Sequence, residues 1–351
     1  MVKNYLKWLA DETPTAWWND SAVPQEIAEA IQNGATGVTT NPVLTIKALQ
    51  ADPDYWSEEV TKIPEGLSPE ERAEALLRIV AVDAAKQFYS IYEASDMQQG
   101  YALGQLNPAI CHDSRLMLEQ ALRYHSWGDN IAVKLPTVKS ALPVVEELAA
   151  RGIAVCTTLN FSVSQGLSVG EAYERGVKKA KENRIPVRPC FVVQQGGRLD
   201  EYLTETAVDN QTDLDTKCIR HAGNAVCKKL YELFQKKGIS AKIMPAGLRR
   251  TSHLTELTGS DMVFSLQPRV QRMVLEEDPP RTIKIDEKIP EAIIAELYKH
   301  REFPRVYDEN GMCPEEFITL GVTQKTLSQF LWTGWVPLET YASRIPSSRW
   351  F

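Results

Sequence analysis

The chain lacks the cysteine and histidine patterns that hold disulfides or metals. Its six cysteines are scattered over 351 residues and include no CxxC pair, so we expect neither a disulfide framework nor a zinc knuckle. Its five histidines form no HxH or HExxH group. The sequence therefore predicts a protein without a structural metal.

Long apolar runs and basic runs are missing as well. No window approaches about 18 consecutive apolar residues, so no membrane span is expected. The first residues lack the apolar core and cleavage site of a signal peptide, so we expect a cytoplasmic protein. The net charge is −7 and the pI is about 5.5, with both signs mixed along the chain, so no nucleic-acid partner is expected.

Strand-like and helix-like stretches alternate along residues 1–275. Residues 69–92, for example, are predicted to form a helix with Ser68 as N-cap and Pro69 in the first turn. Eight such repeats favour a single (β/α)8 barrel of the TIM type. A doubly wound open sheet is the runner-up, but no GxGxxG follows the first strand. The predicted strands are centred near Trp18, Val38, Leu103, Val133, Cys156, Cys190, Ile243 and Phe264.

Local residues predict some of the boundaries. The β-branched run 36–41 indicates a strand that Pro42 stops. Residues 213–237 indicate one long helix with Thr212 as its N-cap. A last helix is expected over residues 323–335, because apolar side chains recur there at helical spacing.

The composition changes after residue 275. Residues 276–281 form a polar connector that contains two prolines. We expect residues 276–351 to be a mostly helical extension that packs on the barrel, with its aromatic stripe turned toward a core. The pairs Trp17/Trp18 and Trp332/Trp335 suit a core or an interface, and core is the default. The sequence does not decide the oligomeric state, so a homodimer stays open.

One lysine lies in a stretch that otherwise suits a buried strand, residues 130–136. Lys134 could be a strand-end lysine whose stem packs while its ammonium reaches water. Alternatively, burial lowers its pKa and makes the neutral amine a nucleophile toward carbonyl groups. The heptapeptide alone leaves both interpretations open.

Other polar residues also follow predicted strands, where barrel enzymes carry their chemistry. Each has an ordinary explanation, such as a helix cap, a loop contact or strand propensity. Together they provide an amine, a carboxylate, amides, a hydroxyl and guanidiniums, which suits imine chemistry on an anionic sugar. These residues are Asp20, Asn41, Gln105, Asn107, Lys134, Thr158, Asn160, Arg198, Arg249 and Arg250.

Several separated motifs resemble one family. Residues 34–42, which end in Thr39-Thr40-Asn41-Pro42, resemble the TTNP signature of the transaldolase family. Residues 131–136 resemble the segment around its Schiff-base lysine, and residues 152–165 resemble its "GI…TL.FS..Q" stretch. Order and spacing agree over about residues 16–270, and residues 317–335 resemble the closing helix of longer members.

The resemblance assigns roles residue by residue. It makes Lys134 the Schiff-base lysine and Asp20 the carboxylate that moves the C4 hydroxyl proton. Thr158 would position the catalytic water, and Gln105 stands where most transaldolases have a glutamate, as in the related fructose-6-phosphate aldolase group. Arg198 and Arg249 would hold a terminal phosphate, which suits the planar geometry of a guanidinium group. The expected substrate-binding residues are Thr39, Asn41, Asn107, Cys156, Arg198 and Arg249.

Some family positions are altered. Cys156 replaces an asparagine that contacts the substrate, and two serines that assist phosphate binding are missing, one of them at Gly247. The water handling and the anion site therefore look changed, while the chemistry at Lys134 looks kept.

The resemblance implies transfer of a dihydroxyacetone unit from an anionic ketose to an aldehyde, without a cofactor, as in the pentose phosphate pathway. The alternative is a class I aldolase that cleaves a ketose phosphate or sulfonate without transfer. Gln105 favours the aldolase, and an extension that closes the site favours transfer. A barrel that only binds a sugar-like ligand is a third reading, although binding alone needs neither the amine nor the base.

Overall fold

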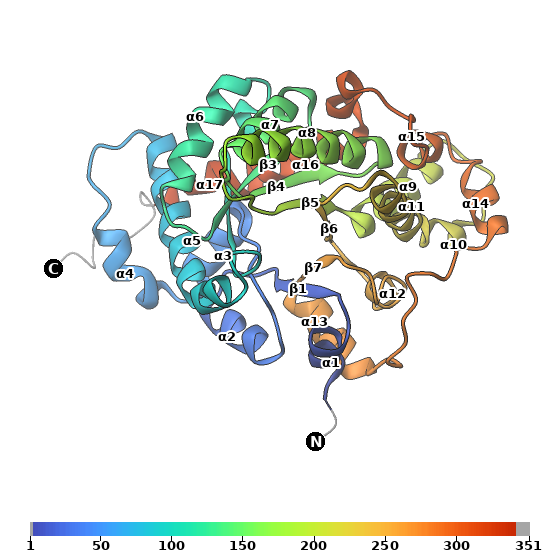
Figure 1. The fold of residues 1–351 in the computed structure, drawn as a ribbon, viewed down its shortest axis with the longest axis horizontal. Coiled ribbons are helices and arrows are strands. Elements are labelled where there is room, and N and C mark those ends of the chain that lie inside the picture. Colours follow the sequence, from blue (N-terminus) through green and yellow to red (C-terminus); the bar gives the residue numbers. More distant parts are fainter. Residues whose placement is uncertain (1–2, 342–351) are drawn as a thin grey trace.

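Seven parallel strands surround a common interior in the computed structural model, which describes residues 3–341 (Figure 1). Strands β2 to β6 pair in chain order, and β1 pairs with β7. Val38 forms isolated bridges to Asn19 and Ala102 and so joins β1 to β2, while β6 contacts β7. The chain therefore forms the expected TIM-type barrel. The strands are β1 (Ala16–Asn19), β2 (Ala102–Gln105), β3 (Ile131–Pro136), β4 (Val155–Asn160), β5 (Cys190–Gln194), β6 (Lys242–Pro245) and β7 (Val263–Leu266).

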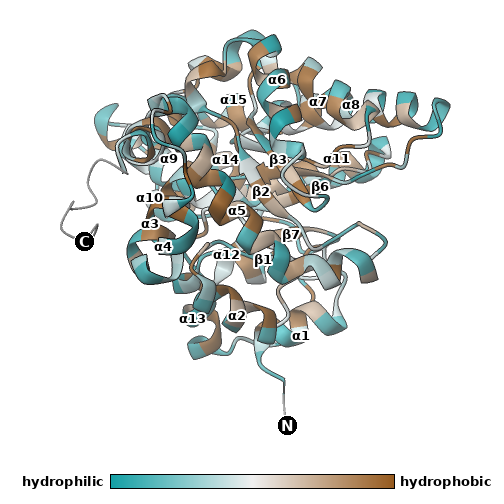
Figure 2. Cartoon of the chain, turned by 90° about the vertical axis from the view of Figure 1, so that its left-hand side faces the viewer, coloured by the Kyte–Doolittle hydropathy of each residue, from teal (hydrophilic) through white to brown (hydrophobic). Residues whose placement is uncertain are grey.

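Helices cover the outside of this sheet, with their apolar faces turned inward (Figure 2). The α-helices are α1 (Tyr5–Glu12), α2 (Pro24–Gln32), α3 (Pro42–Ala51), α4 (Pro53–Thr61), α5 (Pro69–Ala94), α6 (Ser114–His125), α7 (Leu142–Ala150), α8 (Val163–Glu182), α9 (Gly196–Asp209), α10 (Thr216–Ile219), α11 (Ala222–Lys237), α12 (Ser252–Thr255), α13 (Pro268–Glu277), α14 (Glu291–Leu297), α15 (Phe303–Tyr307), α16 (Gly321–Phe330) and α17 (Val336–Glu339). Short 3-10 helices are η1 (Pro108–Ile110), η2 (Lys139–Ala141) and η3 (Pro314–Thr319), and η4 (Leu331–Trp335) is a π-helix.

Two predicted elements are wrong in their extent. The strand expected over residues 36–41 is reduced to the bridge at Val38, because Asn41 caps α3 and Pro42 already lies in its first turn. The single helix expected over residues 213–237 is two helices, α10 and α11. Asp215, not Thr212, caps α10 by accepting a hydrogen bond from the backbone N–H of Lys217.

Aromatic rings fill the interior of the barrel. Trp18 of β1 contacts Phe191 of β5 across the barrel, with ring centroids 4.5 Å apart, and Tyr101 lies 6.1 Å from the same ring. These side chains belong to a buried cluster that continues up to Cys156. Packed aromatic side chains thus fill the barrel interior below the carboxyl ends of the strands.

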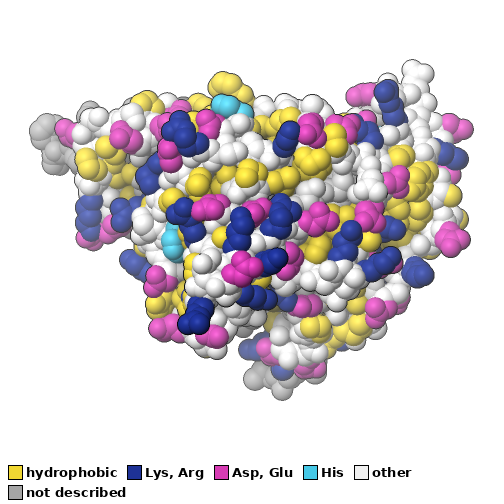
Figure 3. Space-filling view, turned by 45° about the horizontal axis from the view of Figure 1, so that its top comes forward, with side chains coloured by type: hydrophobic (Ala, Val, Ile, Leu, Met, Phe, Trp, Pro, Cys, Tyr) yellow, Lys and Arg dark blue, Asp and Glu magenta, His cyan; other side chains and the backbone are white. Residues whose placement is uncertain are grey.

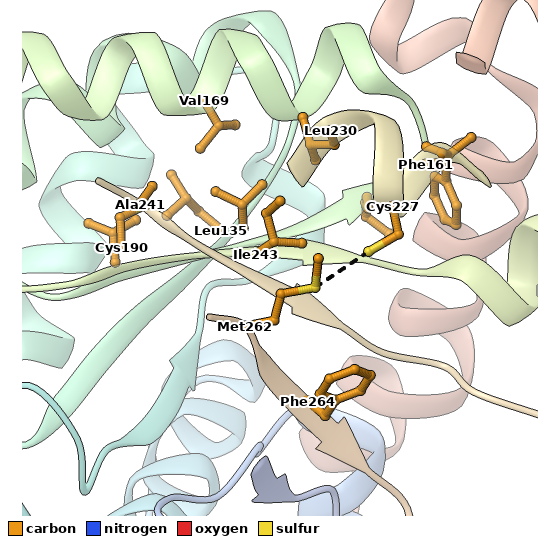
Figure 4. Packing of buried hydrophobic residues seen from close by; sticks show 14 of the residues in the cluster. Leu135, Phe161, Val169, Cys190, Cys227, Leu230, Ala241, Ile243, Met262 and Phe264 are labelled. Carbon is orange, nitrogen blue, oxygen red and sulfur yellow. Dashed lines mark hydrogen bonds between the residues drawn. The ribbon is translucent and has the colours of Figure 1, made fainter. Parts of the chain in front are cut away.

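A second core lies between the strands and the helices (Figure 4). Leu135 of β3 and Ile243 of β6 face Val169 of α8 and Leu230 of α11 in this layer. The Cys227 thiol lies 3.8 Å from a methionine sulfur in the same core. The strands are therefore apolar on both faces, as expected for a parallel sheet covered by helices.

The C-terminal segment packs against the barrel and its helices. Helix α16 contacts β4 and α9, η4 contacts α3, and α17 contacts α5 (Figure 1). Trp335 is buried, as are Trp17 and Trp18, but Trp332 is 64% exposed, so the core default is wrong for Trp332. Residues 342–351 of the expected extension lie outside the described residues.

The surface carries charges of both signs. On the face drawn in Figure 3, Lys and Arg side chains alternate with Asp and Glu. Within residues 3–341, no helix has the length and apolar character needed to cross a bilayer.

Candidate active site

A cavity of about 160 Å³ lies where the strands end. Asp20, Thr39, Asn41, Lys134 and Arg198, all expected at the site, line it. A larger groove of about 740 Å³ lies between α11 and α14, but none of the expected site residues line it. The chemistry-bearing side chains thus meet at the carboxyl end of the barrel, as the strand-end rule predicts.

Lys134 lies on β3 in register with Gln105 of β2 and Cys156 of β4. Register partners on adjacent parallel strands point to the same face, so the three side chains share one layer of the barrel interior. Lys134 is only 3% exposed, and burial lowers its pKa. Among the described residues, its ammonium forms no hydrogen bond or ion pair. This environment favours the neutral, nucleophilic amine.

Asp20 follows β1 and faces the same cavity. Burial raises the pKa of its carboxyl group, while Lys134, a hydrogen bond from Gln267, and the cations Arg198 and Lys47 lower it. Asp20 is no helix cap, because α2 begins after Val23 without a side-chain cap. A carboxylate with a raised pKa beside a buried amine is suited to general base work near neutral pH.

Asn41 and Thr39 combine structural and site positions. The Asn41 side chain accepts a hydrogen bond from the backbone N–H of Leu44 (3.0 Å) and so caps α3. The Thr39 hydroxyl lies 2.7 Å from the Ser265 hydroxyl of β7. The ordinary reading of Asn41 as a cap is confirmed, and the cap itself places its side chain at the cavity.

Three further expected residues lie near Lys134 without lining the cavity. The buried Gln105 carbonyl oxygen has no hydrogen-bond partner among the described residues. Burial raises the pKa of the Cys156 thiol to about 12, so the thiol is neutral at physiological pH. The Thr158 hydroxyl accepts a hydrogen bond from the Gln195 side chain at 3.2 Å.

Asn107 and Arg249 are held elsewhere. The Asn107 side chain caps η1 and donates to Glu70 of α5 at 3.2 Å. Arg249 forms a two-pronged ion pair with Glu201 of α9 (2.5 and 3.1 Å) and donates to two backbone carbonyls. Neither residue lines the cavity.

Helix α16 of the C-terminal segment supplies the outer wall of the cavity. The Phe330 ring centroid lies 6.0 Å from the Lys134 ammonium. The side-chain amide oxygen of Gln329 accepts a hydrogen bond from the Arg198 guanidinium at 2.6 Å. Residues from the far end of the chain therefore cover the lysine.

The sequence interpretation missed several lining residues. Ser265 and Gln267 lie at the end of β7, where the strand-end rule would have found them. Lys47 follows Asn41 by six positions on α3, a helix that was not predicted. Phe330 was assigned to packing, and only its three-dimensional position places it over Lys134.

One known family matches most of the chain. Residues 17–317 match the family model "Transaldolase/Fructose-6-phosphate aldolase". The chain belongs to the transaldolase/fructose-6-phosphate aldolase family. The resemblance seen in the sequence motifs is thereby confirmed, and so is the TIM-barrel fold.

Relatives of this family member are moderately similar. The chain is 29% identical over 186 residues to "Transaldolase 2" of Nostoc sp., covering 51% of this chain and 49% of the relative. It is 25% identical over 267 residues to "Transaldolase 1" of Streptomyces avermitilis, covering 72% and 70%. It is 30% identical over 156 residues to "Transaldolase" of Neisseria gonorrhoeae, covering 44% of each. The matched stretch thus spans about half the length of the first and third relatives.

Proposed function

We propose that the protein is a transaldolase that transfers a dihydroxyacetone unit from an anionic ketose to an aldehyde through a Schiff base on Lys134. The observation that carries this proposal is a buried lysine amine that shares one cavity with Asp20 and has no hydrogen-bond or ion-pair partner within residues 3–341. Burying a lysine away from water costs free energy, because its charged form loses hydration. A site that only binds sugar gains nothing that offsets this cost. Family membership and the relatives' names support the same reaction.

In the first half-reaction, neutral Lys134 attacks the ketose C2 carbonyl, and loss of one water gives an iminium. Asp20 accepts the proton of the C4 hydroxyl, and the C3–C4 bond breaks. The electron pair of that bond enters the iminium and forms an enamine, while C4 leaves as an aldehyde. Asp20 therefore holds one proton while the dihydroxyacetone unit stays on the lysine.

In the second half-reaction, C3 of the enamine attacks the carbonyl carbon of an acceptor aldehyde. Asp20 returns its proton to the new alkoxide, and water hydrolyses the iminium to free Lys134 and the product ketose. We assign the placing of this water to Gln105 and Thr158. Thr39 and Asn41 would hold substrate hydroxyls, and Arg198 the anionic end. Binding roles for Cys156, Asn107 and Arg249 remain predictions from the family resemblance.

Aldol cleavage without transfer is the second candidate, and one observation favours it. Gln105 can orient a water through its free carbonyl oxygen, but it cannot exchange the proton that a glutamate would carry. The Phe330 cover over Lys134 favours transfer, because it limits the water that reaches the enamine. For the transaldolase reaction, we propose a place in cytoplasmic sugar-phosphate metabolism of the pentose phosphate type.

The test is borohydride trapping with fructose 6-phosphate followed by mass spectrometry. We expect a stable adduct on Lys134, and no adduct or turnover in Lys134→Ala. Adduct-free enzyme with every ketose, together with full activity of the variant, would overturn the Schiff-base proposal. Release of free dihydroxyacetone as fast without an acceptor aldehyde as with one would assign the protein to the aldolase group.

A further inference from the structure

The cavity holds two cations besides Lys134, and only one of them was expected. Arg198 lines it from the start of α9, and Lys47 lines it from α3. Both act on Asp20, whose carboxyl group each of them helps to keep ionised. The positive charge around the cavity thus exceeds what the single carboxylate neutralises, and an anionic ligand would restore the balance.

Helix α3 directs Lys47 toward the cavity. Val43, Leu44 and Lys47 all line it, and spacings of three and four residues place them on one helix face. Helical side chains lean toward the N-terminus, which here is the capped end that carries Asn41. Lys47 is exposed and lies at the rim of the cavity, so its long stem can reach over the opening without breaking a contact. The positive end of the α3 dipole adds to the same field.

Lys47 and Arg249 differ in whether other residues of the described structure already engage them. Lys47 forms no hydrogen bond or ion pair with any residue that the structure describes. All three guanidinium nitrogens of Arg249 are engaged, by Glu201 and by the carbonyls of Gly247 and Leu248. Releasing Arg249 for a ligand would break this set, so it is a poor candidate for the second anion-binding residue.

We infer that Lys47 and Arg198 together bind the anionic end of the sugar, with Lys47 taking the place that the family resemblance gives to Arg249. The ligand class is a ketose with a terminal tetrahedral oxyanion, a phosphate or a sulfonate, and the inference rests on the proposed function. Arg198 would offer its planar guanidinium once the anion replaces the side-chain amide oxygen of Gln329, and Lys47 would add a mobile point charge. Because a lysine imposes little geometry, the pair suits either oxyanion.

The experiment compares Lys47→Gln with Lys178→Gln, which removes an equal charge from an exposed lysine on α8 that has no ion pair with any described residue. Half-saturation of borohydride trapping is measured with fructose 6-phosphate, with the sulfonate analogue 6-deoxy-6-sulfofructose and with fructose. Lys47→Gln should raise the half-saturating concentration about tenfold for the two charged ketoses, because one charge-assisted hydrogen bond is lost. For fructose, the increase should be less than about twofold. Lys178→Gln should leave all three values unchanged. In the wild type, the two charged ketoses should half-saturate trapping at similar concentrations, because the pair suits either oxyanion.

Binding of inorganic phosphate, followed by its effect on the thermal midpoint, separates this inference from the proposed function. If phosphate raises the thermal midpoint of the wild type but not of Lys47→Gln, the anion site is supported. This holds even if no ketose forms an adduct, because a missing adduct rejects only the Schiff-base reaction. Trapping that proceeds normally with equal half-saturation in wild type and Lys47→Gln overturns the inference and leaves the reaction standing. An anion-dependent loss in Arg249→Gln but not in Lys47→Gln would also overturn it.

Discussion

The reactivity of Lys134 depends on the few groups around its amine. Burial lowers its pKa, and a negative charge on Cys156 or Asp20 would raise it. The Cys156 thiol has its own pKa raised to about 12 and stays neutral near pH 7, so Asp20 is the anion that opposes burial. Burial raises the pKa of Asp20 in turn. The two groups thus moderate each other, and a change to one moves the other.

This balance predicts a pH dependence. Trapping of dihydroxyacetone by borohydride needs only the neutral amine, so its rate should rise with pH and level off below the ordinary lysine pKa of 10.5. Asp20→Asn removes the anion that favours the ammonium, so the inflection should move to lower pH. Asp209→Asn, an exposed change on α9, should leave the profile in place. An inflection that moves up or stays fixed in Asp20→Asn would contradict the electrostatic account.

Strand ends could be predicted from the sequence, but partners far along the chain could not. Lys134 and Asp20 follow buried strands, so barrel geometry alone brings them together. Asn107 and Arg249 follow the same rule, yet their side chains bond to Glu70 and Glu201, which lie 37 and 48 positions away. Such contacts depend on how helices pack, which strand periodicity does not report.

At the scale of elements, the C-terminal segment reaches the site through close backbone contact. A Cβ atom on Gly334 of η4 would lie 2.8 Å from Pro42 and 3.0 Å from Val43 of α3. Only a glycine lets the segment approach the start of α3 this closely, and the approach sets Phe330 over Lys134. The cavity of about 160 Å³ is smaller than typical ligand sites of roughly 300–1,000 Å³, because Gln329 and Phe330 of α16 line its outer side.

Two helices that line the cavity, α16 and α9, show where sequence patterns succeed and where they fail. The apolar spacing of its side chains predicts the last helix from residue 323, and α16 begins nearby at Gly321. Helix α9 was missed, because it starts with Gly196 and Gly197, which have low helix propensity. Tertiary packing stabilises this helix, with Leu199 and Leu203 fully buried.

The cover leads to a prediction about the fate of the enamine. Phe330→Ala should admit water to Lys134 and raise release of dihydroxyacetone without an acceptor about tenfold, equivalent to about 1.4 kcal/mol of barrier. The matched control is Trp332→Ala, which removes an exposed aromatic ring two positions away. The measurement is the ratio of transfer to hydrolysis at saturating donor. An unchanged ratio in Phe330→Ala would show that this ring does not control water.

At the scale of the whole molecule, the barrel closes with one strand nearly absent. Alternating strands and helices made the fold predictable, and seven of the eight predicted strand centres lie in strands. The eighth, at Val38, survives as two bridges because the chain must turn at once into α3. The sequence pattern indicates how many strands the barrel has. The length of each strand depends on the interior side chains against which it packs.

That interior explains why Gly37 precedes the bridge. A Cβ atom there would lie 2.5 Å from the Trp18 ring, which packs against Phe191 across the barrel and cannot easily move. Gly37→Ala should therefore lower the free energy of unfolding by about 1–3 kcal/mol, as overpacking does, with a lower urea midpoint and an unchanged m-value. The control is Gly128→Ala, whose added Cβ meets nothing nearer than 3.7 Å. Equal stability of the two variants would mean that the ring yields and that closure at Val38 tolerates a side chain.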